Sequence, residues 1–142
     1  MNGGKAFLDT NIILYMYGAE SGKRAIARQL FRRYALSSRM LLSTQVVQEF
    51  YAVGSRKLGM PPPELMEIVE SLLDIPMVVI GPAQILSAIQ IEERYNISFW
   101  DALILAAAES GDAEVLFTED LNGGQQYGAV RVSNPFRPPE PL

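Results

Sequence analysis

Short apolar runs alternate with amphipathic segments along most of the chain. Five apolar runs, the last of them weak, predict buried strands: 5–9, 40–44, 76–81, 114–118 and 129–133. Apolar residues at helical spacing predict the helices: from about 12 to 17, then 23–36, 45–58, 63–73, 82–96 and 98–111. Helices that alternate with short apolar strands indicate an α/β fold with a mostly parallel sheet.

Glycine and proline residues separate these segments. Gly18 and Gly22 interrupt the pattern between the first two helices, and Pro82 opens the helix that begins there. The closing stretch 134–142, "NPFRPPEPL", is rich in proline, and we expect it to be extended. No internal repeat or linker divides the 142 residues, so the sequence predicts a single domain over 1–142 with a proline-rich tail.

Composition narrows the class of protein. Hydrophobic residues make up 49% of the chain, which fits a compact soluble domain with a real core and not a disordered tail. No apolar run reaches the roughly 18 residues that a membrane span needs. The early run "AFLDTNIILYMYG" is broken by Asp9 and Asn11 and lacks a basic leader, so we expect no signal peptide. The chain has no cysteine, which suits a reducing cytoplasm, where we expect the protein to act.

The chain also contains no histidine. This absence removes the commonest general base, the Ser-His-Asp arrangement and every zinc site that includes histidine. An enzyme of this composition depends on carboxylates, hydroxyls, lysine or arginine. A bound metal would have oxygen ligands, which favours magnesium or manganese over zinc.

Positive charge is concentrated in one segment although the net charge is −4. Six of the twelve basic residues lie between 23 and 39, a stretch without Asp or Glu. Arg24, Arg28 and Arg32 follow one another at intervals of four and form one row on the predicted helix. Two interpretations stay open: an ordinary solvated helix face, and a track for the backbone of RNA.

Four acidic residues occupy positions that matter for a parallel sheet. Asp9 and Asp120 follow predicted strands, while Glu49 and Asp101 lie on predicted helices. Each has an ordinary explanation taken alone. Asp9 can cap a helix, Glu49 can be an exposed flank residue, and Asp120 can belong to a turn. Asp101 completes the capping box "SFWD" that begins at Ser98.

Taken together, the four acids favour a cation site. Parallel sheets place ligand sites beyond the carboxyl ends of their strands, where Asp9 and Asp120 lie. If all four carboxylates met within about 5 Å, repulsion of roughly 3 kcal/mol per pair would approach ~20 kcal/mol. That exceeds the ~5–15 kcal/mol stability of a typical domain. Such a cluster needs protons, basic partners or divalent cations, and magnesium beside a phosphate is the favoured answer.

Several motifs resemble, in order, those of PIN-domain ribonucleases, and most closely the VapC toxins of bacterial toxin–antitoxin pairs. They cover nearly the whole chain: "FLDTN" at 7–11, "STQVVQEF" at 43–50, "SFWDALILAAA" at 98–108, "LFTEDLNGGQ" at 116–125 and "VRVSNPF" at 130–136. The resemblance implies a three-layer α/β/α sandwich around a parallel sheet. It also implies an acidic site for magnesium or manganese, with RNA as the substrate.

The resemblance assigns roles to individual residues. The acidic quartet is matched by Asp9, Glu49, Asp101 and Asp120, and its polar supports by Thr10, Asn11 and Thr118. Glu119 is the ambiguous neighbour, and Asp120 is preferred because it directly precedes the leucine of the motif. The family implies a nuclease that cleaves RNA phosphodiesters with metal-activated water. It also implies a homodimer and a cognate antitoxin that inserts residues near the acidic cleft and could use the arginine row.

Two other functions remain possible from the residues. A metal-dependent phosphatase usually carries a second acid close to its first-strand aspartate, but Thr10 and Asn11 follow Asp9 here, and no lysine follows Lys57. A non-catalytic binding module would keep the fold and use the acids structurally. The aromatic side chains are expected to serve packing in the core or in a dimer: Tyr15, Tyr17, Phe50, Tyr51, Phe99 and Trp100.

Overall fold

The computed structural model describes residues 4–137, and strands in that range form one mixed sheet. The strands are β1 (Lys5–Leu8), β2 (Met40–Ser43), β3 (Met77–Val78), β4 (Ala113–Phe117), β5 (Gln126–Tyr127) and β6 (Val130–Ser133). Their order is β3-β2-β1-β4-β6-β5, with every neighbouring pair parallel except β5 and β6. The mostly parallel sheet predicted from the sequence is confirmed.

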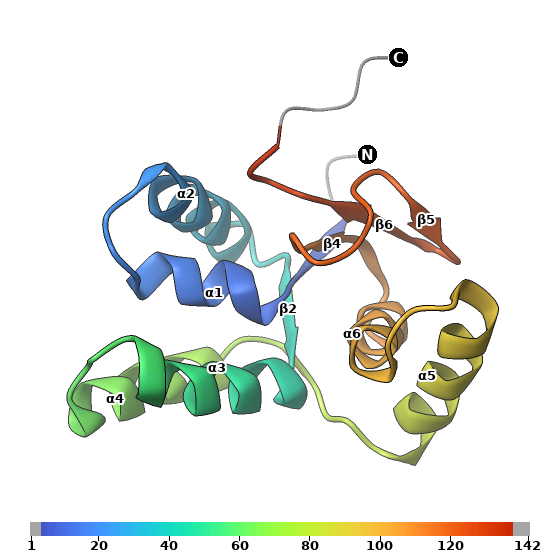
Figure 1. The fold of residues 1–142 in the computed structure, drawn as a ribbon, viewed down its shortest axis with the longest axis horizontal. Coiled ribbons are helices and arrows are strands. Elements are labelled where there is room, and N and C mark those ends of the chain that lie inside the picture. Colours follow the sequence, from blue (N-terminus) through green and yellow to red (C-terminus); the bar gives the residue numbers. More distant parts are fainter. Residues whose placement is uncertain (1–3, 138–142) are drawn as a thin grey trace.

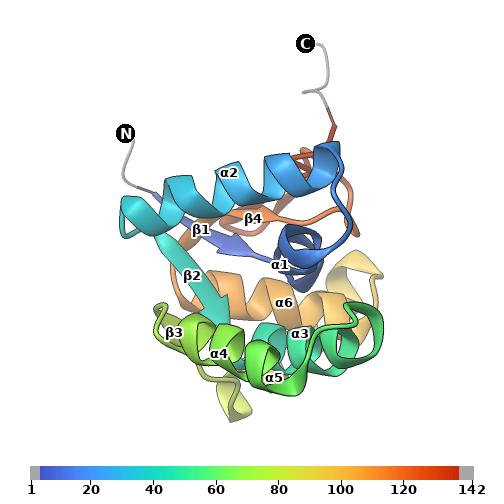
Figure 2. The same ribbon diagram turned by 90° about the vertical axis from the view of Figure 1, so that its left-hand side faces the viewer.

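Helices cover both faces of this sheet. They are α1 (Thr10–Tyr17), α2 (Gly22–Leu36), α3 (Thr44–Lys57), α4 (Pro62–Leu73), α5 (Pro82–Tyr95) and α6 (Phe99–Ser110). Figure 2 shows α2 above the sheet and α3, α4, α5 and α6 below it, which confirms the three-layer α/β/α architecture. Among the described residues, no helix combines the length and the apolar character needed to cross a membrane.

The helices begin where the sequence supplies capping groups. Ser21, Ser43 and Ser98 precede α2, α3 and α6, and each hydroxyl oxygen accepts a hydrogen bond from the N–H three residues later. Proline opens α4 and α5, where its missing N–H costs nothing. The capping function expected of Ser98 is therefore confirmed. Helix α1 begins at Thr10, two residues earlier than expected, because Asp9 is its N-cap.

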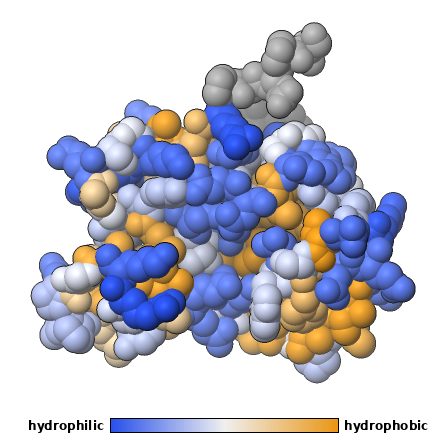
Figure 3. Space-filling model, in the orientation of Figure 1, coloured by the Kyte–Doolittle hydropathy of each residue, from blue (hydrophilic) through white to orange (hydrophobic). Residues whose placement is uncertain are grey.

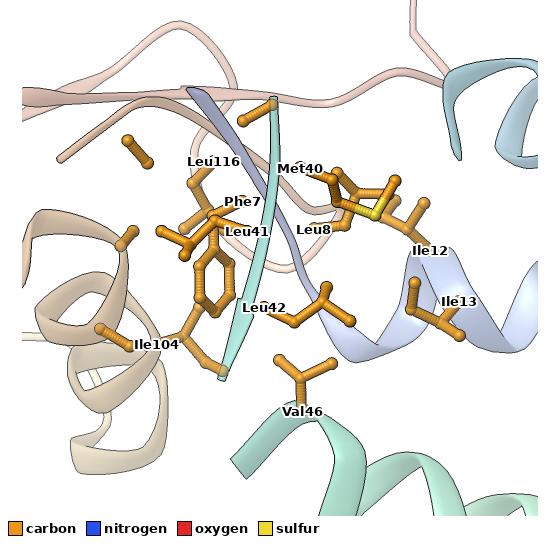
Figure 4. Packing of buried hydrophobic residues seen from close by; sticks show 14 of the residues in the cluster. Phe7, Leu8, Ile12, Ile13, Met40, Leu41, Leu42, Val46, Ile104 and Leu116 are labelled. Carbon is orange, nitrogen blue, oxygen red and sulfur yellow. The ribbon is translucent and has the colours of Figure 1, made fainter. Parts of the chain in front are cut away.

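The main core lies on both faces of the sheet, and Figure 4 shows part of it around β1 and β2. Phe7 and Leu8 of β1 and Leu42 of β2 are fully buried, and they belong to one cluster with Val46 of α3 and Ile104 of α6. Central parallel strands are covered on both faces, which explains their continuous apolar sequences. A smaller cluster with three alanines packs α5 against α6: Ala88, Ala102, Leu103 and Ala106. Phe99 packs against this second cluster, as expected.

The strands differ from the prediction at both edges of the sheet. Only Met77 and Val78 of the predicted run 76–81 form β3, because the N–H of Ile80 donates to Thr44 Oγ1 at 3.0 Å instead of continuing the ladder. The two-residue strand β5 was not predicted, since two residues show no periodicity. At the start of the tail, residues 134–137 form a turn and are not extended. The rest of the predicted tail, 138–142, lies outside the described residues.

The sheet order creates one position suited to a functional site. From β1 the chain first adds β2 and β3 on one side and then returns to place β4 on the other side of β1. Ligands of open α/β sheets bind beyond the carboxyl ends of the strands at such a switch point. The carboxyl ends of β1 and β4 therefore mark where a site is expected, and α1, α3 and α6 all converge there (Figure 1).

Candidate active site

Asp9 lies directly after β1 and is nearly buried, with 6% of its surface exposed. The backbone N–H of Thr10 donates to its Oδ1 at 2.7 Å, and the Thr118 hydroxyl donates to its Oδ2 at 2.8 Å. These two bonds hold the carboxylate across the end of β4. Asp9 therefore serves both interpretations, because it caps α1 and also faces the other acids.

Burial is the main cause of an unusual pKa at Asp9. The pKa rises from 3.8 to about 7 as the net result of burial, which raises it most, of the hydrogen bonds from Thr118 and Thr10, which lower it, and of the negative charges of Asp120 and Glu49, which raise it. An aspartate in this state gives up its proton only near neutral pH unless positive charge is supplied. Asp9 is therefore the acid whose negative charge most requires neutralisation, either by a cation or by a proton.

Three polar residues connect the acids to one another. The Thr10 hydroxyl donates to Glu49 Oε1 at 3.0 Å, which links α1 to α3. Asn11 Nδ2 donates to Asp120 Oδ2 at 3.1 Å and to the Thr118 hydroxyl at 3.3 Å. The residues expected to be polar supports thus contact three of the four acids.

Asp101 occupies the first turn of α6. Its backbone N–H donates to Ser98 Oγ at 3.1 Å, while its carboxylate lines a cleft. Burial raises the pKa of this carboxyl, the hydrogen bond with Ser98 lowers it, and the charge of Asp120 raises it further. The capping interpretation and the site interpretation of Asp101 are therefore compatible.

One cleft of about 230 Å³ brings the four acids together. Its lining residues are Asp9, Thr10, Asn11, Leu14, Gln45, Glu49, Val53, Trp100, Asp101, Ile104 and Asp120. This lining contains no lysine or arginine. The tight cluster considered from the sequence is nevertheless absent, because no three acidic side chains among residues 4–137 are grouped to hold one ion. Each carboxylate is instead held by its own neighbours.

Glu119 points away from this cleft. Tyr15 and Lys23 both donate to its carboxylate, and Lys23 Nζ lies 2.9 Å from Glu119 Oε2. Burial raises the pKa of Glu119, but the hydrogen bonds from Tyr15 and Lys23 outweigh that effect and lower it. Asp120 therefore lines the cleft, whereas Glu119 ties the loop to α1 and α2.

Two of the three arginines in the row contact the end of α1. Arg24 Nη1 donates to the carbonyl of Gly18 at 3.3 Å, and Arg28 Nε donates to the carbonyl of Met16 at 2.9 Å. These are carbonyls that a helix leaves without partners at its C-terminus. The simple solvated face is thus incomplete as an explanation for Arg24 and Arg28. Arg32 is exposed and lies beside Arg28 along α2, and none of the three lines the acidic cleft.

Two further residues line the cleft, Trp100 and Gln45, and neither was assigned to the site from the sequence. Trp100 is 63% exposed and Tyr51 is 53% exposed, so neither lies in the core, and packing in a dimer stays a prediction for both. Tyr15, Tyr17 and Phe50 do pack on the core. Gln45, at the start of α3, is buried yet lines the cleft beside Trp100. Its position, one turn before Glu49 on the same helical stripe, is the signal that could have identified it.

The chain belongs to the PIN domain family, whose model matches residues 6–124. No curated protein matches the sequence significantly. Among solved structures, a toxin–antitoxin complex from Klebsiella pneumoniae superposes with a TM-score of 0.72 at 17% identity, covering 93% of this chain and 98% of the other.

Two further structures share the fold. VapC20 of Mycobacterium tuberculosis, described as a sarcin–ricin loop cleaving toxin, has a TM-score of 0.65 at 14% identity and covers 79% of this chain and 87% of its own. DNA-bound VapBC from Salmonella typhimurium has a TM-score of 0.66 at 20% identity, with coverage of 91% and 96%. These matches agree with the resemblance noted in the sequence motifs.

Proposed function

We propose that this protein is a ribonuclease that depends on magnesium or manganese and acts in the cytoplasm as the toxin of a toxin–antitoxin pair. The observation that carries the proposal is the cleft at the β1–β4 switch point, which four carboxylates line without a basic side chain. Membership of the PIN family and the toxin–antitoxin proteins among its structural neighbours support the same function. The RNA-cleaving description of VapC20 supports RNA as the substrate.

The residues of the cleft fit a hard divalent cation. Their charged groups are carboxylates, the ligands that magnesium and manganese prefer, and no histidine or cysteine competes. Asn11 Oδ1 is buried and has no hydrogen-bond partner, so one acceptor remains free beside Asp120. Asp9 and Asp101 would hold the cation, while Glu49 and Asp120 complete the pocket directly or through water. When bound, the cation activates water and offsets the charge of the scissile phosphate.

The remaining groups prepare the acids for this task. Thr118 and the Thr10 N–H fix both oxygens of Asp9, so the side chain cannot rotate away from the cleft. Thr10 and Asn11 each donate to one carboxylate oxygen, of Glu49 and Asp120 respectively. Outer hydrogen bonds of this kind orient metal ligands and tune their basicity. The supports therefore hold the carboxylates ready before an RNA strand arrives.

The basic test is cleavage of RNA by the purified protein. We expect RNA to be cut with magnesium or manganese and to remain intact with a chelator. A small phosphate ester tested in parallel should remain intact, since its hydrolysis in place of RNA would favour the phosphatase. Sequencing the RNA ends after brief expression would define the target. Intact RNA at millimolar concentrations of both metals would contradict the proposal.

For the arginine row, we propose contact with the RNA backbone. We expect Arg32→Glu to weaken RNA binding about three- to tenfold at low salt and to have little effect at high salt, because phosphate contacts depend on salt. Arg28→Glu should also lower the free energy of unfolding by about 1 kcal/mol, since it loses the bond to Met16. Filter binding and thermal melts measure both effects, with Arg33→Glu as the control for charge. Loss of antitoxin binding alone would assign the row to the protein partner instead.

We also propose a homodimer, supported by an apolar face on α5. Ile85, Leu86 and Ile89 are 42%, 64% and 47% exposed, and Figure 3 shows hydrophobic surface over α5 at the lower right. We expect light scattering to give twice the chain mass for the wild type and a monomer for Leu86→Glu. Leu36→Glu, which alters a leucine on α2 that is 80% exposed, should remain dimeric. A monomeric wild type at tens of micromolar would contradict the dimer.

A further inference from the structure

The acidic cleft has a second wall that cation chemistry does not explain. Leu14 lies one turn beyond Thr10 on α1, and Val53 lies one turn beyond Glu49 on α3. Trp100 and Ile104 of α6, also one turn apart, add to this apolar lining. A site that held only a metal ion and a phosphate would gain nothing from such a wall. The cleft therefore has room for an apolar group beside the phosphate.

Trp100 has the properties of a stacking surface. Its side chain is 63% exposed at the cleft, although burying a tryptophan is strongly favourable. The ring meets Phe99 edge to face at a centroid distance of 5.1 Å, and Phe99 itself is anchored in the α5–α6 core. The indole is thus held in place while much of its surface stays open to solvent. Exposed aromatic rings in clefts of nucleic-acid-binding proteins stack on bases.

Gln45 supplies a buried side-chain oxygen that has no hydrogen-bond donor. Its side chain is 5% exposed, and Nε2 donates to the carbonyl of Trp100 at 3.3 Å. A carbonyl can only accept, so this contact fixes the amide orientation and leaves Oε1 as the free acceptor. Oε1 is buried and has no partner. A buried acceptor without a donor costs free energy, which a ligand with an N–H group would recover.

We propose that Trp100 and Gln45 form a subsite for one unpaired nucleobase next to the scissile phosphate, with the base stacked on the indole and an N–H of its edge donated to Gln45 Oε1. The inference rests on the proposed ribonuclease function and names how that site takes single-stranded RNA. The apolar wall and the orphan acceptor suit a planar group with in-plane donors. This pairing favours a base over the sugar–phosphate backbone, which has no planar face to stack on the indole and no N–H group to donate.

The fluorescence of Trp100 tests the stacking directly, because it is the only tryptophan of the chain. The Asp9→Asn variant in magnesium is titrated with a short single-stranded oligoribonucleotide and with an abasic oligomer of equal length and charge. We expect quenching by the first and none by the second. Equal responses to both, or no response to either, would overturn the subsite. Emission that changes only with protein concentration would place Trp100 between two copies of the chain. Quenching only by an arginine-rich peptide would assign the apolar wall to a protein partner. Either outcome would also overturn the nucleobase subsite.

Variants test the two residues separately. We expect Trp100→Ala to weaken binding of the base-bearing oligomer between about fivefold and a hundredfold, and Trp100→Phe to restore most of it. Gln45→Met keeps the side-chain length and removes the orphan acceptor, so binding should weaken about three- to tenfold while the melting temperature stays unchanged. A lower melting temperature without a change in binding would show that Gln45 is purely structural. If the oligomer quenches Trp100 but the wild type does not cleave RNA, the nucleobase subsite is supported and the proposed ribonuclease function is contradicted.

Discussion

Asp9→Asn and Asp101→Asn should each lower the rate of RNA cleavage by about a thousandfold or more while the fold stays intact. Asparagine keeps the shape of the side chain but removes the charge that holds a divalent cation, and losing charge stabilisation at a reacting phosphate costs factors of this order. The measurement is single-turnover cleavage of a labelled RNA with magnesium and with manganese. Circular dichroism of each variant shows whether the fold is kept.

Glu119→Gln is the matched control for these two variants. It removes the same charge one residue from Asp120, but this carboxylate contacts Tyr15 and Lys23 outside the cleft. We expect it to keep cleavage within about threefold of the wild type and to lose up to ~1 kcal/mol of stability, as exposed ion pairs do. Undiminished metal-dependent cleavage by both Asp9→Asn and Asp101→Asn would remove the assignment of these acids.

The second large effect concerns stability in the absence of metal. The pKa of Asp9 is about 7 in the folded protein and near 3.8 when unfolded, so the folded form binds the proton more tightly. The contribution of Asp9 to the free energy of unfolding is therefore largest below about pH 4, falls as the pH rises towards 7 and stays low above pH 7. The total change from this one group is about 4 kcal/mol. Burial also raises the pKa of Asp101, which adds to the effect in the same direction.

We expect the protein in chelator to melt at a markedly higher temperature at pH 5 than at pH 8, by on the order of 10 °C. Millimolar magnesium or manganese should restore much of the loss at pH 8, because a ligand that binds only the folded form stabilises it. Asp9→Asn has no carboxyl to titrate and should show a much weaker dependence on pH. A wild type that is more stable at pH 8 than at pH 5 in chelator would show that Asp9 is ionised in the folded protein even without a bound cation.

The fold followed from the sequence because its signals are local. The central strand β1 is apolar and buried after Lys5, and serine or proline marks the start of most helices. The edges of the sheet were less predictable. β3 ends where Ile80 bonds to Thr44, a residue 36 positions away, and β5 pairs over only two residues. Both depend on contacts that periodicity does not contain.

The same distinction applies to the site. Asp9 and Asp120 could be placed at one edge because each follows a parallel strand, whereas Glu49 and Asp101 were candidates on predicted helices that the family motifs joined to the same site. The motif already favoured Asp120 over Glu119, but the contacts that hold Glu119 on Tyr15 and Lys23 were not visible in the sequence. The roles of Gln45 and Trp100 depend on which surface α6 leaves uncovered beside α3, so they emerged only from the assembled fold. The spacing of the acids was also a tertiary property, because residues far along the chain hold the carboxylates of Asp9, Glu49 and Asp120 by hydrogen bonds.

Binding of manganese tests the central claim most directly, because it requires neither the natural RNA nor the antitoxin. Free Mn²⁺ can be followed by electron paramagnetic resonance while the wild type, Glu119→Gln and the double variant Asp9→Asn, Asp101→Asn are titrated at pH 8. The acidic cleft predicts saturable binding by the first two proteins and a large loss of affinity in the double variant. Equal binding by all three, or none by the wild type at millimolar manganese, would contradict a cation site formed by these carboxylates.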